Sequence, residues 1–91
     1  MAYNLEFSDL AKEHIRDLKQ SDSASYKKVV KLLGELIEHP RIGTGKPELL
    51  KNDLSGYWSR KINKKDRLVY RINDEAIFVY VLRAKGHYDD K

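Results

Sequence analysis

Two hydrophobic periodicities divide the first forty residues. Apolar and polar side chains alternate over residues 3–8, a period of two that predicts a strand with one buried face. The spacing then becomes helical, first over residues 10–20 and again over residues 24–38. Pro40 ends the second predicted helix, because the residue before a proline is pushed out of the helical region. Two helices joined by a short polar turn are expected to pack antiparallel.

The second half of the chain predicts three further strands. Residues 57–62 and 67–72 alternate apolar and polar side chains, and residues 76–83 form a nearly continuous apolar run after a two-residue turn signal at Asn73-Asp74. The order β-α-α-β-β-β predicts an α+β fold, in which two antiparallel helices pack on one face of a mainly antiparallel four-stranded sheet. The opposite face is expected to be exposed and to display Arg67 with its neighbours. Residues 48–51 predict either an extended segment or a single turn.

Length and composition favour a single domain spanning residues 1–91. The absence of cysteine excludes disulfides and thiolate metal sites. The first residues lack the basic and apolar regions of a secretion signal. The longest apolar run, Ala76–Leu82, is far shorter than the ~20 residues of a membrane helix. These features predict a cytoplasmic protein without a membrane partner.

Positive charge is concentrated in the second half of the chain. Residues 1–40 carry six basic and seven acidic side chains, whereas residues 41–91 carry twelve and seven, so the net charges are −1 and +5. Between Lys46 and Arg71 there are eight basic residues and three acidic ones. A charge concentrated in this way predicts a polyanionic partner, nucleic acid above all. A solvated basic face without any partner is the alternative.

Side chains in this basic half are of the types that cut RNA without a metal ion. The 2′-hydroxyl of RNA can attack the adjacent phosphate once a base takes its proton. Cations must stabilise the charge on the phosphoryl oxygens, and an acid must protonate the leaving 5′-oxygen. Glu48, Arg67 and His87 are of the required types. Each alone also has an ordinary interpretation, as an exposed glutamate, a solvated strand residue or a terminal histidine.

Other conspicuous residues predict structure rather than chemistry. Trp58 and Tyr57 favour core packing over base stacking, although aromatic rings beside cations suit single-stranded RNA. His14 and His39 belong to the helical half and are assigned no role. Histidines this scattered, without cysteine, do not predict a metal site, and no cofactor is expected. The glycines of residues 41–47 lack the spacing of a nucleotide-binding loop.

Four ordered segments of the second half match a known pattern. They are G-K-P-E-L-L-K (Gly45–Lys51), L-S-G-Y-W-S-R-K-I (Leu54–Ile62), D-R-L-V-Y (Asp66–Tyr70) and K-G-H-Y (Lys85–Tyr88). Together they resemble the YoeB/Txe branch of the RelE-type toxins, the toxin halves of bacterial type II toxin–antitoxin systems. The helical half resembles this family by pattern only. The resemblance implies a microbial-ribonuclease-like fold and an mRNA interferase, a ribosome-dependent endoribonuclease that cuts translated mRNA in the ribosomal A site and inhibits translation.

The resemblance also implies roles for individual residues. Glu48 corresponds to the general base, Arg67 to the cation that stabilises the transition state, and His87 to the general acid. Tyr88 is expected to help set the final geometry. The expected RNA or phosphate contacts are Lys46, Lys51, Arg60 and Lys85.

Three features depart from the family pattern. Residues 70–87 are about two residues longer, and in a strand an even insertion leaves the facing of side chains unchanged. Lys85 stands where the pattern usually has arginine, which matters if that cation binds phosphate through two hydrogen bonds. The tail Asp89-Asp90-Lys91 follows the usual terminal tyrosine and could crowd the site or repel RNA.

The resemblance further implies a cognate antitoxin, with a disordered segment that folds over the toxin, besides the ribosome and its mRNA. An acidic segment would suit the +5 half of the chain. A homodimer is compatible with these sequence features. Two other functions compete: a non-catalytic toxin of the same fold that inhibits a protein target, as ParE-like relatives do with gyrase, and a plain RNA- or ribosome-binding module. The base and acid pair argues against both, because a pure binder needs neither.

Overall fold

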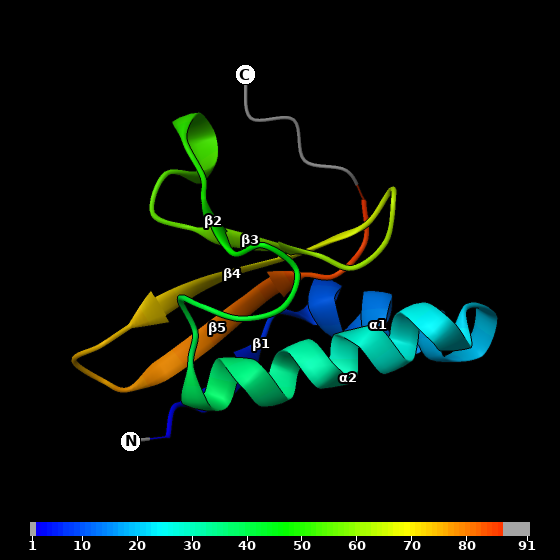
Figure 1. Cartoon of the computed structure of the whole chain (residues 1–91), viewed down its shortest axis with the longest axis horizontal. Coiled ribbons are helices and arrows are strands. Elements are labelled where there is room, and N and C mark those ends of the chain that lie inside the picture. The colour runs from blue at the N-terminus through cyan, green and yellow to red at the C-terminus, as the bar shows by residue number, and fades with distance from the viewer. Residues whose placement is uncertain (1, 87–91) are drawn as a thin grey trace.

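The structure is a computed structural model that describes residues 2–86. Met1 and residues 87–91, which include His87 and Tyr88, lie outside the described residues. The strands and α-helices, labelled in Figure 1, are β1 (Asn4–Phe7), α1 (Asp9–Ser21), α2 (Ser23–Glu38), β2 (Glu48–Leu49), β3 (Trp58–Lys61), β4 (Arg67–Asn73) and β5 (Phe78–Arg83). A short 3₁₀-helix, η1 (Asn52–Leu54), lies between β2 and β3.

One sheet joins all the described strands in the order β1-β5-β4-β3-β2. β1 runs parallel to β5, and every other pair is antiparallel. Both helices lie on the same face of the sheet (Figure 1), so the predicted α+β fold is confirmed. The sheet has five strands rather than four, because Glu48 and Leu49 pair with Ser59 and Trp58 at its edge.

Side-chain caps define where the two helices begin. Ser8 Oγ accepts the N–H of Ala11 at 2.9 Å at the start of α1, and Asp22 Oδ1 accepts the N–H of Ser25 at 3.1 Å at the start of α2. Each cap of this kind contributes about 1 kcal/mol. Asp22 alone separates the two helices, so the chain reverses sharply there. Within residues 2–86, no helix has the length and apolar character needed to cross a membrane.

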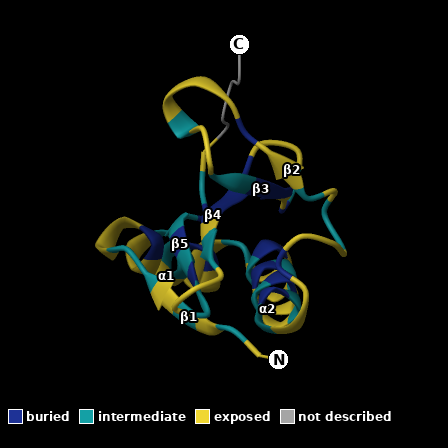
Figure 2. Cartoon of the chain, turned by 90° about the vertical axis from the view of Figure 1, so that its left-hand side faces the viewer, coloured by how far each residue is buried: buried dark blue, intermediate teal, exposed yellow. Residues whose placement is uncertain are grey.

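The hydrophobic core lies between the helices and the inner face of the sheet. In Figure 2 the buried positions of α2 turn toward the strands. The members of this core that α1, α2, β4 and β5 contribute are at most 2% exposed: Ala11, Leu18, Val29, Leu32, Leu36, Leu68, Tyr70, Val79 and Val81. Trp58 packs against this cluster, which confirms its predicted core role.

The β4–β5 connection differs from its prediction. β4 extends through Asn73 and β5 begins only at Phe78, so the turn is longer than the two residues expected. Asn73 Oδ1 accepts the N–H of Ala76 at 2.8 Å, and Ile77 adopts a left-handed conformation with φ of 56°. The pairing of β4 with β5 also shifts register between Val69 and Tyr70. A bulge moves later side chains relative to the ladder, so their facing does not follow from residue count alone.

Candidate active site

Glu48 and Arg67 share the outer face of the sheet, the face turned away from the helices. Directly paired residues on neighbouring strands point to the same side. Glu48 pairs with Ser59, and Ser59 pairs with Val69. Arg67 is two residues before Val69 on β4, so its side chain also points outward. The register therefore places a carboxylate and a guanidinium that are distant in sequence on one face, on strands separated by β3.

A close contact between the backbones of Gly45 and Lys61 positions Glu48 on this face. The N–H of Lys61 donates to the carbonyl of Gly45 at 2.8 Å. A Cβ at Gly45 would lie only 2.9 Å from the carbonyl oxygen of Lys61, and the φ of Gly45 is +85°. Glycine is therefore required at this position for conformational and steric reasons. The loop that precedes β2 can then lie against β3 and carry Lys46 and Glu48 along the sheet edge.

Aromatic and cationic side chains occupy the next row of the outer face. The Arg71 guanidinium lies 6.0 Å from the ring centroid of Tyr57 and 5.5 Å from that of Tyr80. Arg71 itself is exposed, whereas both tyrosines are half-buried. An exposed guanidinium close to aromatic rings offers a surface on which a nucleic-acid base can stack. Arg67 and Arg71 thus lie on the face where the alternation of β4 predicts them.

The end of the described chain is fastened beside Arg67. The N–H of Gly86 donates to Asp66 Oδ1 at 2.9 Å, and Asp66 directly precedes Arg67. On the other side of the chain, His14 Nδ1 accepts the N–H groups of Ala84 and Lys85, each at 3.2 Å. The sequence assigned no role to His14, and no local signal marks it, because the contact spans 70 residues.

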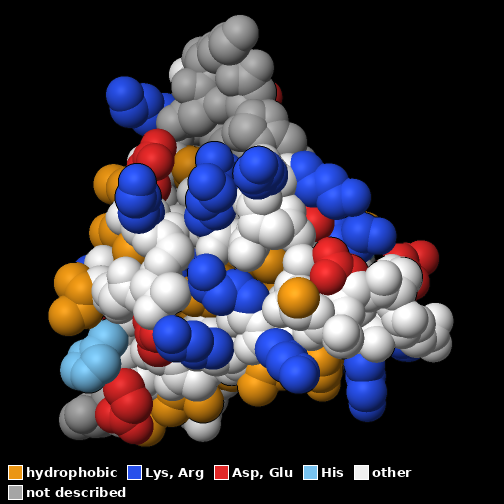
Figure 3. Space-filling view, turned by 45° about the vertical axis from the view of Figure 1, so that its right-hand side comes forward, with side chains coloured by type: hydrophobic (Ala, Val, Ile, Leu, Met, Phe, Trp, Pro, Cys, Tyr) orange, Lys and Arg blue, Asp and Glu red, His pale blue; other side chains and the backbone are white. Residues whose placement is uncertain are grey.

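Positively charged side chains line a cavity among the described residues. Among residues 2–86, no three His, Asp or Glu side chains are grouped to hold a metal ion. The cavity, of about 440 Å³, lies between α2, the loop before β2 and the β3–β4 hairpin. Four lysines line it: Lys28, Lys46, Lys61 and Lys64. Lysine and arginine side chains are spread over this side of the molecule (Figure 3). Of the four, only Lys46 was predicted from sequence.

The other two predicted lysines lie at opposite margins of the site. Lys51 is exposed immediately before η1. The Lys85 ammonium is 3.9 Å from Asp17 Oδ2, so it points toward α1 rather than over the outer face. An exposed ion pair of this length is weak, so it holds Lys85 only loosely. Their contacts with RNA stay predictions.

Arg60 does not have the exposure that an RNA contact requires. Its side chain is 0% exposed and points to the inner face with Trp58 and Ile62. The guanidinium donates to Glu35 Oε1 at 2.8 Å and to the carbonyls of His39 and Ile42, each at 2.7 Å. Its Nε donates to the Tyr70 hydroxyl at 3.1 Å. The structure therefore corrects its assignment: Arg60 is an internal cation that ties the loop after α2 to the sheet.

Glu35 is the carboxylate partner of this buried cation. The Thr44 hydroxyl donates to Oε2 and the Thr44 N–H to Oε1, both at 2.7 Å. These bonds, the hydroxyl first, and the Arg60 guanidinium lower the pKa of Glu35 despite the opposing effect of its burial. The ionised form is therefore the one that holds the loop in place.

Comparison with known proteins gives one consistent likeness. A family model for YoeB-like toxins of bacterial type II toxin–antitoxin systems matches residues 7–88. Toxin YoeB of Mycobacterium bovis is 44% identical over 68 residues, which cover 75% of this chain and 78% of that protein. Two solved Staphylococcus aureus structures are similar, a YoeB dimer with a TM-score of 0.85 and a YoeB–YefM complex with a TM-score of 0.82. Each is 36% identical, and the match covers 97% of this chain and 100% of theirs.

Proposed function

Because this chain belongs to the YoeB-like toxins of bacterial type II toxin–antitoxin systems, we propose that it is a metal-independent endoribonuclease that cleaves translated mRNA in the ribosomal A site. The observation that carries this proposal is the shared outer face of Glu48 and Arg67, with the chain end fastened beside it at Gly86. His87 and Tyr88 follow Gly86 directly in sequence. The proposal treats residues 1–91 as one cytoplasmic domain.

In the proposed reaction, Glu48 takes the proton of the 2′-hydroxyl as its oxygen attacks the adjacent phosphorus. The guanidinium of Arg67 stabilises the charge that develops on the phosphoryl oxygens. His87 donates a proton to the 5′-oxygen as the P–O5′ bond breaks, which leaves a 2′,3′-cyclic phosphate and a free 5′-hydroxyl. Tyr88 helps to orient the phosphate. Each proton-transfer role contributes about 10²–10⁴-fold to the rate.

The basic surface provides a path for the RNA on both sides of the cut. The cavity lined by Lys46 and three other lysines attracts phosphates, and Arg71 with its two neighbouring tyrosines offers a place for a base to stack. Lys51 and Lys85 would add phosphate contacts at the margins. A guanidinium can donate two parallel hydrogen bonds to a phosphate, whereas an ammonium acts as a point charge. We therefore assign the reacting phosphate to Arg67 and the neighbouring phosphates of the RNA to the lysines.

The proposal includes a protein partner. The similar S. aureus protein is solved in complex with YefM and also as a dimer. By analogy with the YefM complex, we propose that a cognate antitoxin binds this chain and covers its basic outer face. By analogy with the dimer, we propose that the chain also forms a homodimer. An acidic antitoxin segment would associate with the +5 half of the chain through complementary charge.

A programmed ribosome carrying mRNA tests the cleavage. The wild-type chain is expected to cut the natural message but not one with a single 2′-deoxy nucleotide at the cut site, because the nucleophile is then missing. Cleavage of the deoxy message would contradict the proposed attack. Binding without cleavage of either message would instead favour a non-catalytic toxin or a binding module.

Matched variants test the two described residues of the site. Glu48→Gln is expected to reduce the cleavage rate by about 10²–10⁴-fold, because it removes the base without changing its size. Glu75→Gln, in the exposed β4–β5 turn, is the control and should cleave normally. Arg67→Lys should also lose most activity, because it keeps the charge but not the two parallel hydrogen bonds. Full activity in a folded Glu48→Gln variant would rule out Glu48 as the general base.

A further inference from the structure

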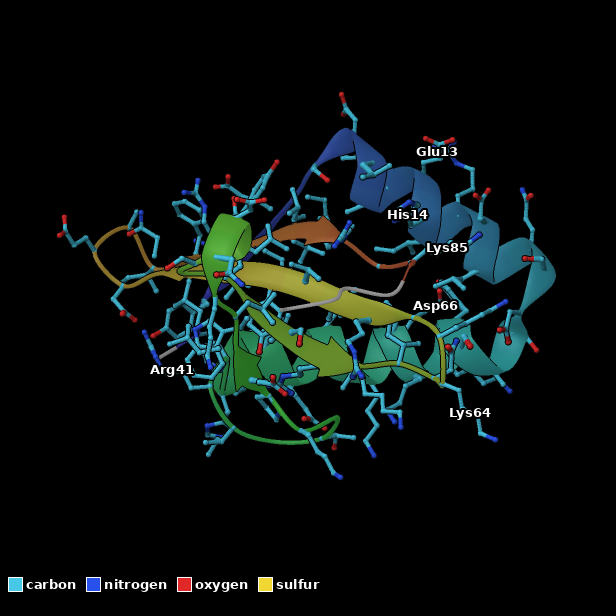
Figure 4. The ribbon with its side chains drawn as sticks, turned by 90° about the horizontal axis from the view of Figure 1, so that it is seen from above. Glu13, His14, Arg41, Lys64, Asp66 and Lys85 are labelled. Carbon is cyan, nitrogen blue, oxygen red and sulfur yellow. The ribbon has the colours of Figure 1, made fainter. Side chains whose placement is uncertain are left out.

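A histidine of α1 holds the segment that follows β5, from the side opposite to the β3–β4 hairpin. His14 Nδ1 lies 3.2 Å from both the Ala84 and the Lys85 nitrogen, and both N–H groups donate to it. In Figure 4, His14 and Lys85 lie next to each other, with Asp66 on the other side of the chain end. The last described residues are thus held between α1 and the β3–β4 hairpin.

This contact depends on the protonation state of the imidazole. A neutral histidine has one ring nitrogen that accepts and one that donates, and here Nδ1 must be the acceptor. Protonation turns both nitrogens into donors. In a protonated His14, Nδ1 would carry a hydrogen and could no longer accept the two backbone N–H groups. Both hydrogen bonds would therefore be lost.

The surroundings of His14 favour the neutral form. Partial burial and the Lys85 ammonium, in that order, lower the pKa of His14 from its ordinary value of 6.5, and Arg83 acts in the same direction. Glu13 and Asp17, on the same helix, raise the pKa but are outweighed. Asp66 faces the chain end from the hairpin and is bonded to Gly86.

We propose that His14 is a positioning residue for the cleavage reaction, whose neutral imidazole anchors the backbone at residues 84–85 and so determines where His87 enters the site. The inference rests on the proposed function, because it assigns to His14 the placement of the proposed general acid. His14 does not touch the reacting phosphate. It acts through two peptide groups that lie a few residues before His87 in the chain.

The anchor is expected to weaken in acid. A histidine with a lowered pKa binds its proton less readily in the folded chain than in the unfolded chain. Its contribution is therefore fully present above about pH 6.5 and declines as the pH falls below that value toward the pKa in the folded chain. Activity that depends on the anchor should decline over the same range.

Three variants separate the anchor from general effects on stability. His14→Asn replaces Nδ1 by an amide oxygen attached to the same Cγ position, so it keeps an acceptor that does not titrate. His14→Leu keeps bulk but removes the acceptor. His39→Asn, at the exposed end of α2, is the matched control for loss of a histidine. Circular dichroism establishes that each variant is folded.

Amide hydrogen exchange at Ala84 and Lys85 measures the anchor without reference to catalysis. In His14→Leu the protection of these amides should fall about tenfold, which corresponds to the loss of about 1.4 kcal/mol of local stability. In His14→Asn it should be retained. The wild type should lose protection below about pH 6.5, whereas His14→Asn should not. Unchanged protection in a folded His14→Leu would overturn the anchor.

Cleavage of ribosome-bound mRNA then tests the positioning role. His14→Leu should lower kcat about tenfold with little change in KM, and His14→Asn and His39→Asn should stay near wild type. Lost amide protection with an unchanged kcat would overturn the positioning role. If the wild type itself does not cleave mRNA while the amides respond as expected, the proposed function fails and the anchor is supported.

Discussion

The backbone N–H of Gly86 donates to the carboxylate of Asp66 at 2.9 Å, which ties the residue before His87 to the residue before Arg67. Asp66 is only 3% exposed. Its other carboxylate oxygen accepts from Asn63 Nδ2 at 2.9 Å, and its backbone carbonyl accepts the N–H of Ile62 at 3.0 Å. One buried carboxylate therefore closes the β3–β4 hairpin and fastens the chain end to it.

Asp66→Asn should disturb both the hairpin and the chain end. The amide keeps the shape of the carboxylate but offers an N–H where the present residue accepts, so either Asn63 or Gly86 loses its partner. We expect the free energy of unfolding to fall by about 1–3 kcal/mol, measured by urea denaturation, and mRNA cleavage to slow. Asp53→Asn, at an exposed position of η1, is the control. Wild-type stability and cleavage in Asp66→Asn would show that the tie is dispensable.

Glu35→Ala should destabilise the fold, because it leaves the buried guanidinium of Arg60 without a carboxylate partner. Arg60 would keep its carbonyl partners but lose the Glu35 carboxylate, and its side chain is fully buried. We expect a loss of about 3 kcal/mol in the free energy of unfolding. Glu38→Ala, in the exposed last turn of α2, should cost little in the same urea experiment. A loss below about 1 kcal/mol for Glu35→Ala would mean that the backbone carbonyls alone satisfy Arg60.

The lowered pKa of Glu35 predicts acid sensitivity of the fold. The folded chain releases this proton more readily than the unfolded chain, so the stabilisation is fully present above the ordinary pKa of 4.5 and is lost as the pH falls below it. Thr44→Val removes the hydroxyl that contributes most to the lowered pKa. The free energy of unfolding should therefore fall less steeply between pH 5 and pH 3 in Thr44→Val than in the wild type. Equal slopes would contradict the role of Thr44.

The lysine-lined cavity predicts a salt-dependent contribution to RNA binding. Each ammonium that neutralises a phosphate of a single strand adds about 0.7 to the slope of log K against log salt concentration. Lys28→Gln combined with Lys64→Gln should therefore reduce the slope for a short single-stranded RNA by about 1.4. Lys27→Gln with Lys31→Gln, exposed on α2 but not lining the cavity, should leave it unchanged. If the two double variants have the same slope, RNA binding depends on the net charge of the chain and not on the cavity.

Local pattern predicted most of the elements because their periodicity depends on near neighbours. The helices lie within one or two residues of their predicted bounds, and the alternation of β4 already placed Arg67 and Arg71 on one face. The same alternation placed Arg60 with Trp58 and Ile62 on an apolar face, a signal that opposed its assignment to RNA. The four segments after Gly45 identified the family by residue type and spacing alone.

By itself, the amino-acid sequence determined the two helices, the main strands, the basic second half and the family. Only the tertiary structure decided that Glu48 belongs to a fifth strand, that Arg60 is internal, and that His14 and Asp66 hold the chain end. The physical reason is one of range. Helical and strand patterns arise from residues a few positions apart, whereas these contacts join residues up to 71 positions apart and exist only after the sheet has taken its register.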